Sequence, residues 1–585
     1  MASAVRIGNC SGFYGDRLSA MHEMLTGGEL DYLTGDYLAE LTMLILGRDR
    51  MKNPERGYAK TFLRQLEECL GLARDRRVRI VANAGGLNPA GLADAIRTLA
   101  DTLGVPVTVA HVEGDDLLPR AAELDLGAPL TANAYLGAWG IVECLAGGAD
   151  VVVTGRVTDA SVIVGPAAAH FGWRPTDHDR IAGAIAAGHV IECGTQATGG
   201  NYAFFTELGD LTHPGFPIAE IHSDGSSVIT KHPGTGGAVT VGTVTAQLLY
   251  EIGGARYANP DATLRVDSIT LTDDGEDRVR LSGVRGEPPP PTVKVSLNSL
   301  GGFRNEVTFV LTGLDIDAKA DLVRRQLEAG LTVKPAELEW TLARTDHPDA
   351  DTEQTASALL RCVARDPDAA TVGRRFSSAA VELALASYPG FTSTAPPGDG
   401  QVYGVFTAAY VPADKLTHVA VHADGTRVDI PAAAHMPFPI VRRRVSAIAK
   451  RAGDRWSCRV EKIAHAAFAI AFSTGEEGVD QMPCRILSRG DADPRRRADR
   501  GRNVELFEER SFAGESINVF RLNIRVAGAT QIAKPHVINE DENNVGAIVT
   551  NGTEGMERAS DERANEKQAA DHLRRRAVPL LPGFC

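Results

Sequence analysis

The chain has 585 residues, 43% of them hydrophobic and 23% charged, so it is a globular protein of about two to four domains. Its net charge of −14 disfavours nonspecific binding to nucleic acid or to an anionic membrane. Eight cysteines without a CxxC pair, no secretory leader and no long apolar run favour a cytoplasmic protein that neither binds nucleic acid nor enters a membrane.

Three apolar runs in the N-terminal half each end in a polar, glycine-rich turn and are followed by a helical pattern. The pairs of run and turn are 5–7 with 8–16, 78–82 with 83–89, and 151–154 with 155–159. Strands alternating with helices favour parallel βαβ units, and ligands of such sheets bind at the carboxyl ends of the strands. Residues 1–254 are therefore predicted as an α/β ligand-binding domain with an open, mostly parallel sheet and flanking helices. We further expect helices at 36–46, 89–103 and 132–146, and a strand at 105–109.

The pattern changes near residue 255, and residues 255–455 are predicted as a second, α+β region. Its predicted strands are 264–271, 279–284, 293–297, 307–311 and 402–410, and its helices 318–329, 355–365 and 377–387. Residues 418–421 and 427–430 favour a hairpin across an Ala-Asp-Gly turn. Residues 456–585 form a C-terminal extension, predicted as a small α+β domain with a charged run at 485–510, a strand at 518–526 and a helix at 561–576.

The first turn offers Asn9, Ser11 and Asp16 among three glycines, which let a backbone approach a ligand closely. Its glycine spacing is not that of a dinucleotide fingerprint, so we predict no NAD site. The alternative is a tight strand-to-helix turn in which Asp16 serves only as a cap.

The second and third turns add amides and a charge pair. Asn83 and Asn88 lie at a helix start, where anions are favoured, although Asn88 also suits the N-cap position. Arg156 can hold a carboxylate or phosphate through its fork, and Asp159 can act as a base. A purely structural Arg156–Asp159 pair is the competing interpretation.

Residues 189–201 combine a cysteine, a glutamine and two glycines. Cys193 is a candidate nucleophile, with His189 or Glu192 for proton transfer, but a free cysteine is more often a small buried hydrophobe. We expect Gln196 to line the site. Further on, Lys231, Thr235 and Gly236 form a glycine-rich turn suited to an anion, without the P-loop pattern. No metal site or cofactor is predicted, because zinc spacings, HExxH and GxSxG are missing from the sequence.

These motifs together resemble the acyclic terpene utilisation protein AtuA family. The matching segments are RIGNCSGFYGD (6–16), DYLTGDYLAE (31–40), NAGGLNP (83–89), ANAYLG (132–137), GADVVVTGRVTDA (148–160), GHVIECGTQATGG (188–200) and PGTGG (233–237). The resemblance spans about residues 5–450, and the Ser-Gly-Asp-Lys-Gly motif of many members' C-terminal domain is missing. It implies a place in the breakdown of branched, isoprenoid-type acids that are handled as coenzyme A thioesters.

We therefore expect an enzyme that acts on a branched carboxylic acid or its acyl-CoA, of lyase or hydratase type. Asp159 or Asp16 would be the base and Arg156 and Lys231 the anion holders. The hydrogen-bonding frame would be Asn83, Asn133 and Gln196. One alternative is a noncatalytic binding or scaffold subunit of a degradation pathway; a metal-dependent hydrolase is a third. The expected partner is the small carboxylate or acyl-CoA, and the sequence leaves a homo-oligomer open.

Overall fold

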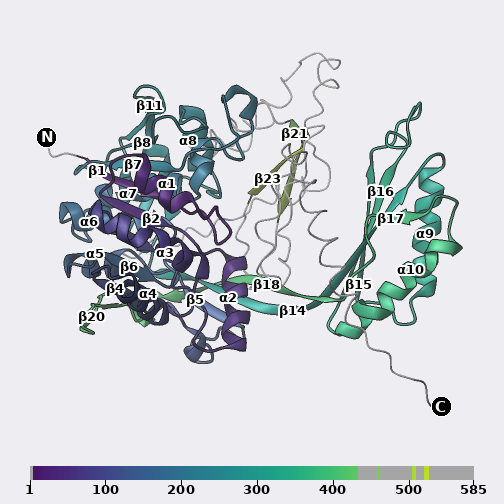
Figure 1. Ribbon diagram of the computed structural model, residues 1–585, viewed down its shortest axis with the longest axis horizontal. Coiled ribbons are helices and arrows are strands. Elements are labelled where there is room, and N and C mark those ends of the chain that lie inside the picture. The colour runs from purple at the N-terminus through teal and green to yellow at the C-terminus, as the bar shows by residue number, and fades with distance from the viewer. Residues whose placement is uncertain (1–3, 433–457, 460–502, 509–519, 526–585) are drawn as a thin grey trace, which may run out of the picture. The chain divides into compact units, whose positions relative to one another are not determined.

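The computed structural model describes residues 4–432, 458–459, 503–508 and 520–525, and its largest element is an 11-stranded sheet (Figure 1). Its order is β11 (Thr270–Asp273), β12 (Val279–Ser282), β8 (Ser227–Lys231), β7 (Pro217–Ile221), β1 (Val5–Asn9), β2 (Tyr32–Gly35), β3 (Arg79–Ala82), β6 (Val151–Thr154), β4 (Val109–Glu113), β19 (Val419–Val421) and β20 (Arg427–Asp429). Neighbours are parallel from β1 to β4 and antiparallel at both flanks. The predicted α/β class is confirmed.

Helices cover both faces of the parallel block, because its strands are apolar on both sides. Val151 and Val153 of β6 pack in one core with α1 (Ala20–Gly27), α3 (Lys60–Asp75) and α4 (Pro89–Leu103). Val152, pointing the other way, packs in a second core with α5 (Trp139–Ala146), α6 (Ser161–Phe171) and α7 (His178–Ile191). Since each helix returns the chain to the start of a strand, the loops after the strands all lie at one edge, the carboxyl edge.

A second sheet is organised by one long strand, β14 (Thr292–Leu311). The first half of β14 pairs with β5 (Thr131–Ala134) and β18 (Gln401–Pro412), and its second half with β16 (Ala358–Asp366) and β17 (Thr392–Ser393). β15 (Glu337–Arg344) pairs with β16 at the edge. α9 (Ile316–Gly330) and α10 (Phe376–Ala386) share a third core with the second half of β14. The pairing of β14 with β5 brings residues near 294 beside residues near 135.

The remaining described elements are short. α2 (Glu40–Lys52) follows β2, and α8 (Val241–Leu248) follows β8. One three-stranded sheet comprises β9 (Arg256–Ala258), β10 (Thr263–Arg265) and β13 (Arg285–Glu287). A separate one comprises β21 (Cys458–Arg459), β22 (Asn503–Glu508) and β23 (Phe520–Arg525), so the strand predicted at 518–526 is confirmed. The charged run at 485–510 lies outside the described residues except for 503–508, and the helix predicted at 561–576 lies wholly outside them.

Several predicted elements are wrong in type or place. Residues 358–365 of the helix predicted at 355–365 lie in strand β16, because pairing with β14 and β15 overrides the helix propensity of the alanines and leucines. The helix predicted at 132–146 is β5 followed by α5, and the two strands predicted at 293–297 and 307–311 are one strand.

Two further boundaries shift. The helix expected from residue 36 begins at Glu40, so that 36–39 are loop, and the strand expected at 105–109 is β4, at Val109–Glu113.

The main sheet draws strands from both sides of residue 254, since β11, β12, β19 and β20 all belong to it. The expected hairpin at 418–430 is confirmed as β19 and β20.

Candidate functional site

Three of the predicted turns meet at the carboxyl edge, and a fourth loop joins them. The backbone N–H of Asp36, after β2, donates to the carbonyl of Ser11, after β1, at 2.9 Å. Asn83 Nδ2, after β3, donates to Asp36 Oδ1 at 2.6 Å. Arg156 Nη1, after β6, donates to the carbonyl of Leu38 at 2.6 Å. Direct hydrogen bonds therefore hold residues from four strand ends in one place.

Arg156 is the centre of this arrangement. Its side chain is 3% exposed, and its Nη1 lies 2.8 Å from Asp159 Oδ1. The guanidinium carbon stands 4.3 Å from the ring centroid of Tyr135, in cation–π geometry. Its backbone N–H donates to Asp115 Oδ2 at 2.8 Å. Arg156 Nε and Asp159 Oδ1 have no aligned hydrogen bond, so the pair keeps hydrogen-bonding capacity for another group.

Four carboxyl groups interact electrostatically with Arg156: Asp36, Glu40, Asp159 and Glu192. Burial raises the pKa of Asp36 well above its usual range, and the charge of Asp159 raises it further. Burial also raises the pKa of Asp159, although Arg156 opposes the shift. At Glu40 burial acts in the same direction, but Arg156 and Lys294 outweigh it and hold the pKa below its usual value. The cluster therefore holds carboxyl groups that favour protonation beside one that favours ionisation.

The solvent-facing side of the cluster consists of Glu40, Asp159 and Lys294, which we call the rim. Their side chains are 37%, 31% and 39% exposed. Lys294 Nζ lies 3.8 Å from Glu40 Oε1 and 4.7 Å from the centroid of the Tyr135 ring. Tyr135 Oη donates to Glu40 Oε1 at 2.9 Å. A ligand at the rim would thus meet two carboxyl groups, of Glu40 and Asp159, and an ammonium group.

The polar side chains of the first turn make structural hydrogen bonds. Asn9 Nδ2 donates to the carbonyls of Ile191 and Glu192, each at 2.8 Å, which ties the turn to the end of α7. Ser11 Oγ donates to the carbonyl of Phe13 at 3.0 Å. Asp16 accepts the backbone N–H groups of residues 12 and 17, both at 2.9 Å, in a compact turn, and burial raises its pKa. The side-chain hydrogen bonds of these three residues thus go to the turn itself and to the end of α7.

Of the predicted asparagines discussed next, Asn88 has a structural role and Asn133 lies beside the Arg156 cluster. Asn88 accepts the backbone N–H of Gly91 at 2.9 Å, which confirms that it is the N-cap of α4. Asn133 Nδ2 donates to Asp115 Oδ2 at 2.8 Å, on the same oxygen that fixes the backbone of Arg156. Asn133 Oδ1 is buried and has no hydrogen-bond partner, so this amide has an acceptor to spare.

The backbone of Cys193 lies against Gly12 of the first turn. The space is so narrow that a Cβ at position 12 would come within 2.6 Å of the Cys193 carbonyl carbon. Burial raises the pKa of the Cys193 thiol far above its ordinary value, which disfavours the thiolate that a nucleophile needs. Gln196, in the short 3-10 helix Gly194–Thr198, is partly buried.

Lys231 belongs to a separate group at the end of β8. Its Nζ lies 2.8 Å from Asp277 Oδ2 and donates to the carbonyl of Thr235 at 2.7 Å. Thr235 Oγ1 donates to the carbonyl of His232 at 2.7 Å, and the carbonyl of Gly236 accepts the N–H of Gly215 at 2.9 Å. The ammonium charge is therefore already balanced, and the structure does not join this turn to the Arg156 cluster.

Sequence reasoning missed Asp36, Glu40, Asp115, Tyr135 and Lys294. The pattern of residues 31–40 carried the signal for the first two, because a short apolar run ending in Gly35 precedes Asp36 as in the recognised turns. Lys294 had no local signal, since only the pairing of β14 with β5 brings it to Tyr135.

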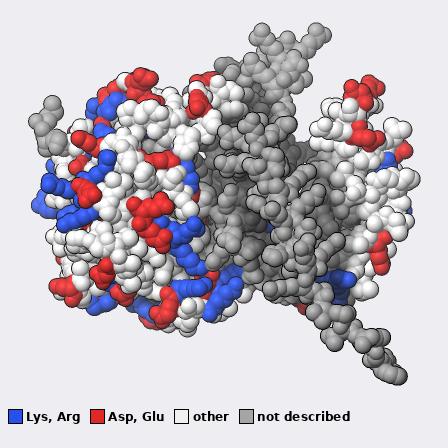
Figure 2. All heavy atoms as spheres, in the orientation of Figure 1, with Lys and Arg blue, Asp and Glu red and all other residues white. Residues whose placement is uncertain are grey.

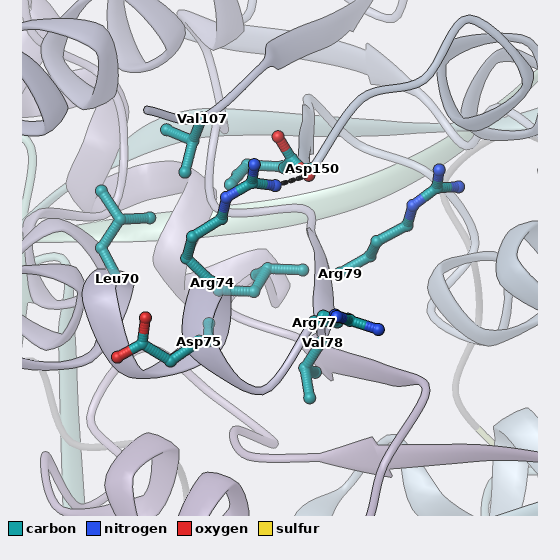
Figure 3. A pocket seen from close by; sticks show the side chains of 11 residues that line it. Leu70, Arg74, Asp75, Arg77, Val78, Arg79, Val107 and Asp150 are labelled. Atoms are coloured by element: carbon teal, nitrogen blue, oxygen red, sulfur yellow. Dashed lines mark hydrogen bonds and ion pairs between the residues drawn. The ribbon is translucent and has the colours of Figure 1, made fainter. Parts of the chain in front are cut away.

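A cavity of about 540 Å³ lies at the opposite, amino edge of the sheet, lined by Arg74, Arg77, Arg79, Asp75, Asp150 and apolar neighbours (Figure 3). Arg74 Nη1 lies 3.3 Å from Asp150 Oδ1. α3, α4 and α5 end at this edge, where carbonyl groups carry partial negative charge, and arginines there complement those helix ends. This accounts for the arginines, so we do not take the cavity as the chemical site.

Within the described ranges, no group of three or more His, Cys, Asp or Glu side chains is arranged to hold a metal ion. None of the described helices combines the length and the apolar character needed to cross a bilayer. Figure 2 shows basic and acidic residues interspersed over the visible described face.

The fold and the cluster define an α/β protein whose polar groups gather at the carboxyl edge of a parallel block. The family model described as acyclic terpene utilisation family protein AtuA matches residues 5–422, and the chain belongs to this family. The membership links the protein to acyclic terpene utilisation. No curated protein and no solved structure matches the chain.

Proposed function

We propose that this protein is a cytoplasmic enzyme of branched or isoprenoid-type acid catabolism that acts on a carboxylic acid or its coenzyme A thioester. The proposed chemistry is acid–base catalysis of lyase or hydratase type. The observation that carries the proposal is the buried Arg156 with Asp159 beside it, at the boundary between the cluster and solvent. Family membership, which links the protein to acyclic terpene utilisation, supports an isoprenoid-type substrate.

The residues at the rim suit this chemistry. Breaking or forming a bond beside a carbonyl needs a base, an acid and a group that stabilises negative charge on oxygen. Asp159 would be the base, since burial raises its pKa and so makes its carboxylate a better proton acceptor, while Arg156 lies beside it to stabilise the ionised form. Lys294, the exposed cation of the rim, would hold the carbonyl or carboxylate oxygen, a part that we had assigned to Lys231 from the sequence alone.

The experiment is a turnover assay on purified protein without added metal or cofactor. Branched hydroxy and unsaturated acids and their coenzyme A thioesters are incubated with the wild type and with Asp159→Asn, and products are followed by mass spectrometry. The proposal expects turnover of at least one of these acids or thioesters by the wild type and a loss of about a hundredfold or more in the variant. Tight binding with no turnover by either protein would overturn it in favour of a binding or scaffold subunit.

A further inference from the structure

The end of α7 holds a buried pair of titratable side chains that the proposed chemistry does not use. His189 Nδ1 lies 3.2 Å from Glu192 Oε1, and His189 Nε2 lies 3.0 Å from the carbonyl oxygen of Tyr250. The residues are 1% and 5% exposed. The backbone of Glu192 is fixed as well, because its carbonyl accepts a hydrogen bond from Asn9.

The hydrogen bonds of His189 determine where the protons lie. A carbonyl oxygen only accepts, so Nε2 must donate to Tyr250. A neutral imidazole has a single N–H, so Nδ1 is then an acceptor, and the proton between Nδ1 and Glu192 Oε1 belongs to the carboxyl group. The alternative is a buried imidazolium beside a buried carboxylate, which pays the desolvation of two charges.

The surroundings favour the neutral pair. Burial raises the pKa of Glu192, and the nearby charges of Asp159 and Glu251 raise it further, while Arg156 opposes them. Burial lowers the pKa of His189 against the effects of Tyr250, Glu251 and Asp159. Both shifts move the proton toward Glu192.

The second oxygen of Glu192 is an unused acceptor. Oε2 is buried and has no hydrogen-bond partner among the described residues. Leaving a buried acceptor unpaired costs about 1–3 kcal/mol, so such an atom is normally satisfied by a ligand or an ordered water. The Glu192 carboxyl lies within electrostatic range of both Asp159 and Arg156, so this unpaired oxygen belongs to the same polar cluster.

We propose that Glu192 is a neutral carboxylic acid, held by His189, whose Oε2 accepts a hydrogen bond from a hydroxyl group of the substrate. This inference rests on the proposed function and narrows its substrate class to hydroxylated branched acids or their thioesters. Glu192 is then a specificity-determining residue, and His189 is a positioning residue that keeps the carboxyl proton away from Oε2.

The protonation state is tested without any substrate. Infrared spectra of the wild type and of Glu192→Gln are subtracted at neutral pH, and the difference isolates the absorption of the Glu192 carboxyl. The inference expects the variant to lack one band of a protonated carboxyl group. Loss of a carboxylate band instead would overturn it, because Glu192 would then be ionised.

The ligand class is tested by calorimetry with β-hydroxyisovaleryl-CoA and its deoxy counterpart isovaleryl-CoA. The wild type should bind the hydroxylated thioester about tenfold more tightly, which corresponds to one hydrogen bond. Glu192→Gln keeps an acceptor oxygen and a donor for His189, so it should preserve this preference; Glu192→Leu should abolish it. Equal affinity of the wild type for both thioesters would overturn the inference, since an ordered water would then satisfy Oε2.

The two proposals fail in different ways. If the wild type neither binds nor converts any of the acids or thioesters, the proposed function fails and so does the hydroxyl ligand, whereas the infrared result still decides the protonation state. If the wild type converts thioesters without preferring the hydroxylated one, the proposed function stands and the inference about Glu192 is wrong. The calorimetric comparison of the two thioesters uses the wild-type protein, so it is informative even if a Glu192 variant does not fold.

Discussion

Arg156 Nη1 lies 2.8 Å from Asp159 Oδ1, yet the Arg156 side chain is 3% exposed and the Asp159 side chain 31%. One partner of this ion pair is thus fixed in the interior while the other reaches solvent. Arg156 is held further by the carbonyl of Leu38 and by the ring of Tyr135. The pair therefore has a rigid side and an accessible side, which is the arrangement expected of a positioned base.

Replacing Arg156 by alanine should destabilise the protein strongly. The change leaves the cluster carboxyl groups without their central cation, and loss of one partner of a buried pair costs about 3–5 kcal/mol. Urea denaturation measures the free energy of unfolding. The matched control is Arg74→Ala, which breaks an exposed pair with Asp150 and should cost about 1 kcal/mol or less. Equal losses in the two variants would show that Arg156 does not hold the cluster together.

Lys294→Met should weaken ligand binding more than it weakens the fold. The ammonium group is exposed at the rim, and a charge-assisted hydrogen bond is worth about 1.5–3 kcal/mol, so the dissociation constant for a coenzyme A thioester should rise about tenfold or more. Lys319→Met is the control, because Lys319 Nζ, on α9, also stands over a tyrosine, Tyr388, which belongs to the third core. Titration calorimetry compares the two; an unchanged affinity in Lys294→Met would remove Lys294 from the site.

The stability of the protein should depend on the ionisation of Asp115. Burial raises the pKa of Asp115 from 3.8 to about 7. The pKa of Asp115 is higher in the folded protein than in the unfolded chain. Its contribution to the free energy of unfolding is therefore complete below pH ~4 and is lost as the pH rises through about 7, a change of roughly 4 kcal/mol.

Asp115→Asn cannot ionise and should lack this dependence. The difference in unfolding free energy between wild type and variant, measured at several pH values from 4 to 8, should therefore shift in favour of the variant as the pH rises. Effects of all other groups cancel in this comparison. A difference that stays constant with pH would mean that Asp115 titrates normally in the folded protein.

Cys193→Ala should retain activity in the turnover assay. Burial keeps its thiol protonated, so it supplies no thiolate for covalent catalysis. The same protonation predicts slow alkylation of Cys193 by iodoacetamide at pH 8, followed by peptide mass spectrometry. Complete loss of turnover in a folded Cys193→Ala protein, together with rapid alkylation, would reinstate the nucleophile.

The sequence sufficed for the parallel block and for its polar edge. β-branched runs such as 151–154 predict buried strands, and each ends in a recognisable turn, so the meeting of Ser11, Asn83 and Arg156 near one edge followed from the general rule for α/β sheets. The residues with a purely local purpose, such as the N-cap Asn88, could also be anticipated.

The rest of the site depends on pairing over long sequence distances. Lys294 reaches Tyr135 only because β14 pairs with β5, and a twenty-residue strand cannot be told from two short ones by alternation alone. Glu40 lies at the first turn of α2, and its role is evident only once Tyr135 and Lys294 surround it. Conversely, the turn that begins at Lys231 has the composition of an anion site, but Asp277, 46 residues later in the chain, neutralises the charge of the lysine.

The central claim is that substrate binds at the carboxyl edge, beside Asp159 and Lys294. Crystals of Asp159→Asn soaked with β-hydroxyisovaleryl-CoA would test it most directly. The account predicts density for the acyl group within hydrogen-bonding distance of Lys294 Nζ and residue 159. Density for the thioester only in the arginine-lined cavity at the amino edge, with the rim unoccupied, would contradict it.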